Sequence, residues 1–425
     1  MRPLRDLPTE VRALVVVAFM VALGYGVVAP AIPLFAREFG VSKTAASAVI
    51  SAFAFMRLIT APFVGRLVNA FGERVMLATG IGIVSVSSLL AGFSGAYWQL
   101  LVLRGVGGVG SIMFSVSAAS ILVRVTPSHL RGRAQGTWAG AFLLGMIAGP
   151  AVGTVAVWSL RAPFFLYAGT LVVAGLLALA TLRHSEFAAP GAARTSPLQL
   201  QAALRQRAYL GALAAGFAGD FAIVGARSAI VPQFMSDRLH LGSGWVYLAF
   251  LVVSVVSGAL LLPFGRLADT RGRRPVILLG LALGAVGYVL LPGAPTLAGL
   301  MVAMALLGVA GAADSVAPGA VMGDVVGSRG GTVVAVFQMA GDLGAIIGPV
   351  TAGAIADAHG YGATFLVCAA VALAPLPLVA ASPETLKPAV EPDTAALATD
   401  IAEPAEAAEA SEPPEPPEAR HSGVS

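Results

Sequence analysis

Six ionisable residues stand inside long apolar runs of this 425-residue sequence. A charged side chain near the centre of a bilayer is costly unless it has a partner or lines a watery cavity, so each is a candidate functional residue. Carboxylates in such places can take up and release protons, and guanidinium groups can bind anions or act on the carboxylates. The six candidates are Arg57, Arg104, Asp220, Arg227, Asp314 and Asp342.

The apolar runs that hold these residues are long enough to cross a membrane. A membrane helix needs about 20 apolar residues, and the sequence contains twelve such runs. The chain is 57% hydrophobic and only 11% charged, against about 25% charged in soluble proteins. We expect the spans at residues 11–36, 44–64, 75–95, 97–123, 134–158, 162–182, 208–235, 244–264, 275–293, 296–322, 332–356 and 361–381.

One short pattern occurs twice, 200 residues apart, each time between two of these runs. The copies are Gly65-Arg66-Leu67-Val68-Asn69-Ala70-Phe71-Gly72-Glu73-Arg74 and Gly265-Arg266-Leu267-Ala268-Asp269-Thr270-Arg271-Gly272-Arg273-Arg274. We interpret each copy as a polar, Arg-rich turn bounded by glycines. Its repetition at half the chain length predicts a duplicated membrane protein.

Basic residues predict the orientation. With a cytoplasmic N-terminus, the inner segments hold 19 Lys and Arg residues and the outer loops hold 4. Because positive charge favours the cytoplasmic side, we expect both termini inside and the chain in the cell inner (plasma) membrane.

The chain divides into four parts. The N-terminal six-helix half covers residues 1–183, a cytoplasmic linker 184–207, and the C-terminal six-helix half 208–381. Residues 382–425 form a tail with 10 acidic and 2 basic residues, which we expect to be disordered and cytoplasmic.

The repeated pattern and the span count resemble the major facilitator superfamily over residues 11–381. The resemblance implies an all-α integral membrane fold, with twelve transmembrane helices in two pseudo-symmetric six-helix halves. In that family the acid of the loop pattern caps or pairs across the halves and helps to hold one conformation. The second copy keeps it as Asp269, whereas the first has the uncharged Asn69, so we expect a weaker latch there.

Two further segments are similar to family motifs. The segment from Arg104 to Gly110 resembles the helix 4 motif, with Gly107 in place of the usual Gln. That motif ties its Arg to proton coupling or substrate contact; the alternative is an Arg that braces a helix pair. The helix 5 pattern Gly145-x-x-x-Gly149-Pro150-x-x-Gly153 resembles the motif of drug:proton antiporters, although Thr154 replaces its last Gly. Helix 11 repeats the pattern as Gly344, Gly348-Pro349 and Gly353. Glycines one turn apart permit close helix contact, and proline bends the helix, so we expect a hinge.

The resemblance also implies that helices 1, 4, 7 and 10 line a central cavity. Arg104, Asp220, Arg227 and Asp314 would then face it. Asp220 and Arg227 are seven residues apart, which in an α-helix puts them on one face about 10 Å apart along the axis. Helix 1 holds no acid, and Tyr25 is its notable cavity candidate. The alternative role for the two aspartates is structural pairing with a neighbouring Arg.

Arg57 on helix 2 and Asp342 on helix 11 are expected to pair. Counted from their cytoplasmic helix ends, their depths are roughly 11 and 15 Å, and the resemblance makes these helices neighbours across the two halves. Such a pair would act as a gate between the halves. A permanent structural pair, or no contact, are the alternatives.

These patterns favour a secondary active transporter over an enzyme. The sequence has no phosphate-binding loop, no metal-ligand spacing and no hydrolase triad, so we expect no cofactor and no metal. The leading interpretation is proton-coupled efflux of small amphipathic compounds or drugs by alternating access. One alternative is exchange or uptake of an anionic metabolite through Arg104 and Arg227, and another is a transport-inactive scaffold or receptor. The expected partners are a small-molecule substrate, protons and the lipid bilayer, without nucleic acid, and we expect a monomer.

Overall fold

The computed structural model describes residues 7–126, 130–154, 158–182, 197–293, 296–326 and 331–386. Helices dominate this part of the chain, and it contains no strand. The first half consists of α1 (Thr9–Val28), α2 (Ala31–Arg37), α3 (Lys43–Phe71), α4 (Glu73–Gly92), α5 (Tyr97–Val125), α6 (Arg131–Val152) and α7 (Ala162–Leu182). The short helix α8 (Pro197–Leu204) follows. The second half consists of α9 (Arg207–Asp220), η4 (Phe221–Ile230), α10 (Val231–Asp237), α11 (Ser243–Arg271), α12 (Arg273–Leu290), α13 (Leu297–Val326), α14 (Gly331–Leu373) and α15 (Leu376–Ala380).

The described residues make up twelve membrane helices, as the sequence predicts. Ten segments are long and apolar enough to cross a membrane. The last, Val336–Ala380, holds two helices because the chain reverses at Gly360, whose φ of 81° is non-helical. The Thr364 hydroxyl lies 3.4 Å from the Ala352 carbonyl, whereas twelve residues of straight helix would separate them by about 18 Å. The remaining helix is the 22-residue α6.

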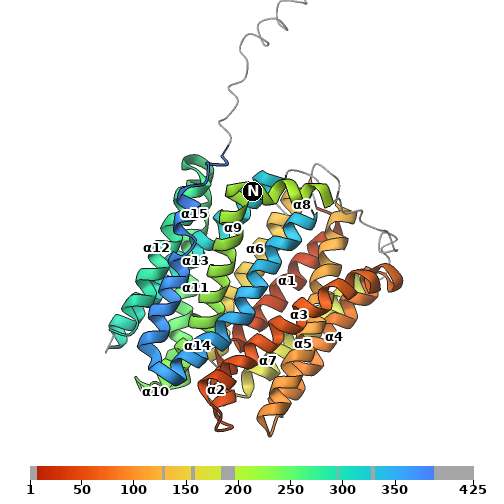
Figure 1. Cartoon of the computed structure of the whole chain (residues 1–425). Coiled ribbons are helices and arrows are strands. Elements are labelled where there is room, and N and C mark those ends of the chain that lie inside the picture. The colour runs from red at the N-terminus through yellow and green to blue at the C-terminus, as the bar shows by residue number, and fades with distance from the viewer. Residues whose placement is uncertain are drawn as a thin grey trace, which may run out of the picture. The chain divides into compact units, whose positions relative to one another are not determined.

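The two halves repeat one packing scheme. In the first half α1 packs on α6 and α7, α4 on α5, and α5 on α3. In the second half α9 and η4 pack on α14, α12 on α13, and α13 on α11. The halves meet through α3 against α14 and α6 against α11, so the boundary repeats as well (Figure 1). Both halves belong to one compact unit that ends at Thr385.

Three helices expected to be continuous are interrupted. Helix 1 breaks between α1 and α2 at Ala29 and Pro30, because prolines cannot donate the backbone hydrogen bond that would continue it. Helix 7 changes to a π-helix over η4, and the Val231 N–H bonds to the Ala226 carbonyl five residues back. The last helix breaks at Pro375 before α15.

The repeated loop pattern is mostly helical, which corrects the expectation of a polar turn. α3 runs to Phe71 and α11 to Arg271, so the first seven residues of each copy are the last turns of a helix. The turn itself is a single glycine, Gly72 with φ 83° and Gly272 with φ 110°. Residues with side chains rarely adopt this left-handed region, so both turns favour glycine.

Most of the predicted linker 184–207 and tail 382–425 lies outside the described residues, which include 197–207 and 382–386.

Candidate functional site

An ion pair joins the two halves between the middle of α3 and the first part of α14. Arg57 Nε lies 3.8 Å from Asp342 Oδ1, and the two side chains are 22% and 25% exposed. Arg57 Nη1 also donates a 2.6 Å hydrogen bond to Ser111 Oγ of α5. The pair is therefore anchored to the first half through Ser111, while Asp342 belongs to the second.

Asp220 extends this cluster of charges. It ends α9 and interacts electrostatically with Asp342, Arg57 and Arg227. Its carboxylate lies against Gly341, where an added Cβ would collide with Oδ2. Asp220 is partly buried and makes no hydrogen bond or ion pair with any described residue. A carboxylate is therefore available beside the cross-half pair.

Arg227 and Asp314 line a small cavity inside the second half. The cavity holds about 20 Å³, room for about one water molecule. Glycines form much of its wall: an added Cβ on Gly280 would lie 2.6 Å from Asp314 Oδ1, and one on Gly311 would lie 3.7 Å from Arg227 Nη1. Arg227 Nε has no hydrogen-bond partner. Asp314 is partly buried and makes no hydrogen bond or ion pair with the described residues. Arg227 and Asp314 are thus close enough to interact electrostatically, although no ion pair joins them.

The π-helix separates Asp220 from Arg227, which corrects the expectation that they share one face. An α-helix advances about 100° per residue, so seven residues return nearly to the same side. The wider π turn advances less, and η4 occupies the whole interval after Asp220. Asp220 accordingly meets α14 at Gly341, while Arg227 meets α13 at Gly311.

Arg104 lies in an aromatic enclosure on α5. Its guanidinium Cζ is 4.6 Å from the centre of the Phe53 ring, a cation–π contact. The Tyr25 ring lies 6.2 Å from Phe53 and 6.5 Å from Tyr167. Arg104 is only 2% exposed, its Nε has no hydrogen-bond partner, and it makes no ion pair with the described residues. The structure therefore does not bring Arg104 together with Asp220 or Asp314.

The helix 5 glycines lie at points of close helix contact. Added Cβ atoms on Gly145 and Gly149 would collide with the α1 backbone, at Phe19 and Gly26 respectively. Gly153 instead contacts the ring of Tyr247, a residue of α11 in the other half. Pro150 lies inside α6 between the last two glycines.

The echo in α14 has the same arrangement. Gly344 and Gly348 lie against the backbone of Phe217 and Phe221, within the second half. Gly353 contacts Lys43 and Thr44 at the start of α3, in the first half.

Each loop pattern is stabilised by an ion pair that sequence reasoning missed. The acid and the base exchange places between the two halves. In the first half Glu73 Oε1 accepts a 2.6 Å hydrogen bond from Arg124 and a 3.0 Å bond from Ser120. In the second, Arg273 Nε lies 3.2 Å from Asp324 Oδ2. The paired positions correspond, with Glu73 at the place of Arg273 and Arg124 at the place of Asp324, each 200 residues apart. This correspondence was the signal that could have revealed both pairs.

Asp269 pairs with Arg273 of its own half at 2.9 Å and is 70% exposed. The cross-half contact that the resemblance implies for this acid is not made in this structure. The side chain of Asn69 lies outside the described part of the chain. Gly65 and Gly265 face open space, and Arg66, Arg74 and Arg266 belong to helix ends around the turns.

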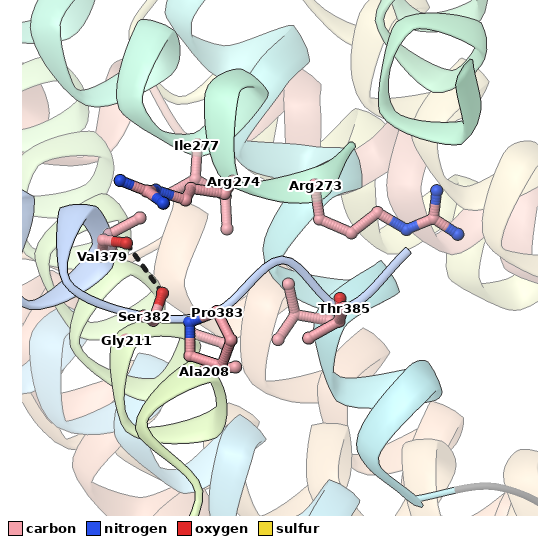
Figure 2. A pocket seen from close by; sticks show the side chains of 11 residues that line it. Ala208, Gly211, Arg273, Arg274, Ile277, Val379, Ser382, Pro383 and Thr385 are labelled. Carbon is pink, nitrogen blue, oxygen red and sulfur yellow. Dashed lines mark hydrogen bonds between the residues drawn. The ribbon is translucent and has the colours of Figure 1, made fainter. Parts of the chain in front are cut away.

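The segment after α15 returns to the second loop pattern. Glu384 accepts hydrogen bonds from the N–H groups of Arg273 and Arg274, at 2.8 and 3.0 Å, and so caps the start of α12. Ser382 donates to the Val379 carbonyl at 2.7 Å. Figure 2 shows the small hollow of about 10 Å³ that Arg274, Pro383 and their neighbours line. It is too small for an organic substrate.

The described residues hold no group of three or more His, Cys, Asp or Glu side chains placed to bind a metal ion.

Comparison with known proteins shows which families share this sequence and fold. The family model described as Major Facilitator Superfamily matches residues 14–257 and 222–408. A chromaffin granule amine transporter from Homo sapiens is 33% identical over 362 residues, which is 82% of this chain and 66% of that protein. Multidrug resistance protein 1 from Bacillus subtilis (strain 168) is 32% identical over 169 residues, 40% of this chain and 43% of that protein.

Solved structures share the fold. A POT family transporter in complex with 5-aminolevulinic acid superposes with a TM-score of 0.75 at 12% identity, covering 90% of this chain and 98% of the other. The human organic anion transporter MFSD10 gives a TM-score of 0.64 at 19% identity, covering 87% and 99%. At these identities the likeness concerns the fold alone.

Proposed function

Because the chain belongs to the Major Facilitator Superfamily, and is thus a multi-pass membrane transporter and not an enzyme, we propose that it exports small amphipathic compounds, amines among them, in exchange for protons. The observation that carries this proposal is that two carboxylates, those of Asp220 and Asp314, have no ion-pair partner. Both are partly exposed inside the membrane region and have no hydrogen bond or ion pair among the described residues.

A carboxylate in this setting has two ways to lower its free energy. It can take up a proton, or it can hold a cationic ligand as its counter-ion, because an isolated charge is costly in a low-dielectric site. One carboxylate cannot do both at once. Competition between a proton and a cationic substrate for the same group is the simplest basis for antiport.

The similarity to proteins named as amine transporters and multidrug resistance proteins supports an amphipathic, amine-bearing substrate. The charge arrangement is consistent with that class. Asp220 adds a carboxylate beside the Arg57–Asp342 pair at the boundary between the halves. This carboxylate makes no ion pair among the described residues and is a candidate counter-ion for an amine.

Exchange or uptake of an anionic metabolite is the second candidate. Arg227 favours it, since its Nε has no partner and its side chain lines the small cavity. Arg104 does not, because it is 2% exposed beneath aromatic rings in this conformation. A carboxylate, Asp314, shares the Arg227 cavity and would repel an anion.

We place the protein in the plasma membrane with both termini in the cytoplasm, so that export in exchange for protons would carry the substrate into the medium. The charge asymmetry of the loops supports that orientation. The residue roles proposed above require only one protomer.

Proton release on substrate binding tests this function directly. Purified protein in weakly buffered detergent solution is mixed with the cationic dye ethidium at a pH near neutral. We expect protons to be released as the dye binds, and the double variant D220N/D314N to release none. An anionic metabolite analogue, such as a dicarboxylate, should release no protons. If dye binding releases no protons in the parent protein, the proposal is wrong.

A further inference from the structure

The two halves make several polar contacts at the end of the bundle away from the loop patterns, where α2 and α10 lie (Figure 1). Asp357, beyond the hinge glycines of α14, reaches the first residues of α3. Its Oδ2 accepts hydrogen bonds from Thr44 N at 2.9 Å and Thr44 Oγ1 at 2.6 Å. Its Oδ1 accepts a 3.1 Å bond from Lys43 N and lies 3.8 Å from Lys43 Nζ.

These contacts make Asp357 a helix cap supplied by the other half. The first N–H groups of a helix have no partner within it, and a carboxylate there is favoured by hydrogen bonding and by the helix dipole. The residue before α3, Ser42, satisfies Ala45 N at 3.2 Å. The Lys43 and Thr44 amides are left to Asp357, so the start of α3 is completed only while the halves are together.

A glycine allows the approach. An added Cβ on Gly353 would lie 2.7 Å from Thr44 Cα and 3.0 Å from the Lys43 carbonyl. Gly353 is one helical turn before Asp357 on the same side of α14. The backbone of α3 thus packs against Gly353, while the Asp357 carboxylate caps the N-terminal end of α3.

The equivalent boundary between α6 and α11 is closed in a different way. The Tyr247 ring contacts Gly153, and its hydroxyl donates a 2.7 Å hydrogen bond to the Val27 carbonyl. Tyr247 is fully buried. Lys43 and Asp357 are instead 21% and 31% exposed, so water competes for the carboxylate contact and can replace it when the halves part.

We propose that Asp357 is a latch that holds the bundle closed at this end by capping α3 of the opposite half. This rests on the proposed alternating-access function, in which this end must open to release substrate. Opening transfers the Lys43 and Thr44 amides and the Asp357 carboxylate to water, and closing restores all four contacts. The latch is therefore reversible and sets the balance between the two states.

A buried reporter position tests the latch without any substrate. Ser47 lies one turn after Thr44, is 0% exposed, and contacts Gln233 of the other half at 3.3 Å. The chain's single cysteine, Cys368, is replaced by Ala, and Ser47→Cys supplies the label site. The rate of reaction with a charged maleimide is then measured on the purified protein in detergent.

We expect D357N and T44V each to raise the labelling rate about tenfold, which corresponds to about 1.4 kcal/mol in the opening equilibrium. The matched control is D324N, which removes a carboxylate that contacts Arg273 and Thr385 and no residue of the first half; its rate should equal that of the parent. Parent-like labelling in D357N and T44V overturns the proposal, and so does equal acceleration by D324N.

General unfolding is detected separately. Variants that retain Cys368 and native Ser47 report on the core, because Cys368 is 1% exposed. Cys368 should stay unreactive in D357N if only the latch has opened, and its rapid reaction there would refute the latch. Since no dye or proton gradient is used, this result is independent of whether proton exchange is found.

Discussion

Reversing the charges of Arg57 and Asp342 gives the most informative test of the contact between the halves. At 3.8 Å and an effective dielectric constant of about 20, the attraction is about 4 kcal/mol. The two side chains are 22% and 25% exposed, and both lose hydration on pairing, so we take about 2 kcal/mol as the net contribution. That corresponds to a factor of about 30 in the balance between conformations.

The single reversals should cost more than this. Arg57→Asp would place a third carboxylate beside Asp342 and Asp220, and Asp342→Arg would place two guanidinium groups together. In the double reversal, the new Arg at position 342 keeps Asp220 as a neighbour, and Ser111 can donate to the new Asp at position 57. Attraction is restored, although the geometry differs from the original.

The assay is gradient-driven ethidium transport in proteoliposomes, normalised to reconstituted protein. We expect each single reversal to lower the initial rate at least tenfold and the double reversal to recover a substantial part of it. R57Q, which removes the charge without reversing it, should fall between the parent and Arg57→Asp. If the double reversal transports no better than the worse single variant, the two residues do not act as a pair.

Further predictions concern stability and can be measured by thermal unfolding in detergent. Gly149→Ala should lower the melting temperature by several degrees, because the added Cβ would collide with the α1 backbone. Gly140→Ala in the same helix is the control, since its Cβ meets nothing within 4 Å, and the melting temperature should be unchanged or slightly higher. Glu73→Gln should destabilise the protein by about 2 kcal/mol, because it removes the negative charge that Arg124 contacts at 2.6 Å; a change below about 0.5 kcal/mol would contradict this. Tyr247→Phe should cost about 1 kcal/mol through its lost hydrogen bond, and an unchanged melting temperature would show that the bond contributes nothing.

The sequence predicted the fold because its main signals are local or repeated. Twelve apolar runs and the 200-residue repeat identify the helices and the two halves, and both turn glycines, Gly72 and Gly272, have the positive φ that their place in the pattern implies. The ends of α3 and α11 were predicted too early, at residues 64 and 264 instead of 71 and 271. Polar residues such as Arg66 and Asp269 look like a turn in sequence but continue the helix beyond the apolar core.

The candidate site was predicted less completely, since it depends on how helices are wound and packed. Arg57 and Asp342 have matching depths, which the sequence supplies, and the structure places them in contact. The π-helix that turns Arg227 away from Asp220 leaves no periodicity signal, because Arg227 and Ser228 are the only polar residues among the ten of η4. The cap that Asp357 supplies to α3 joins residues more than 300 positions apart, and nothing in either segment alone indicates it.

The most direct test of proton-coupled export is flux driven by a proton gradient alone. Proteoliposomes with an acidic interior and a neutral exterior, loaded with no dye, are given external ethidium, and dye accumulation is followed in the parent protein and in D220N, D314N and the double variant. We predict accumulation that collapses when nigericin dissipates the pH difference, and no gradient-dependent accumulation in the double variant, although downhill dye exchange persists. Accumulation in the double variant equal to that of the parent, or parent accumulation that is unaffected by nigericin, would contradict proton coupling through these carboxylates.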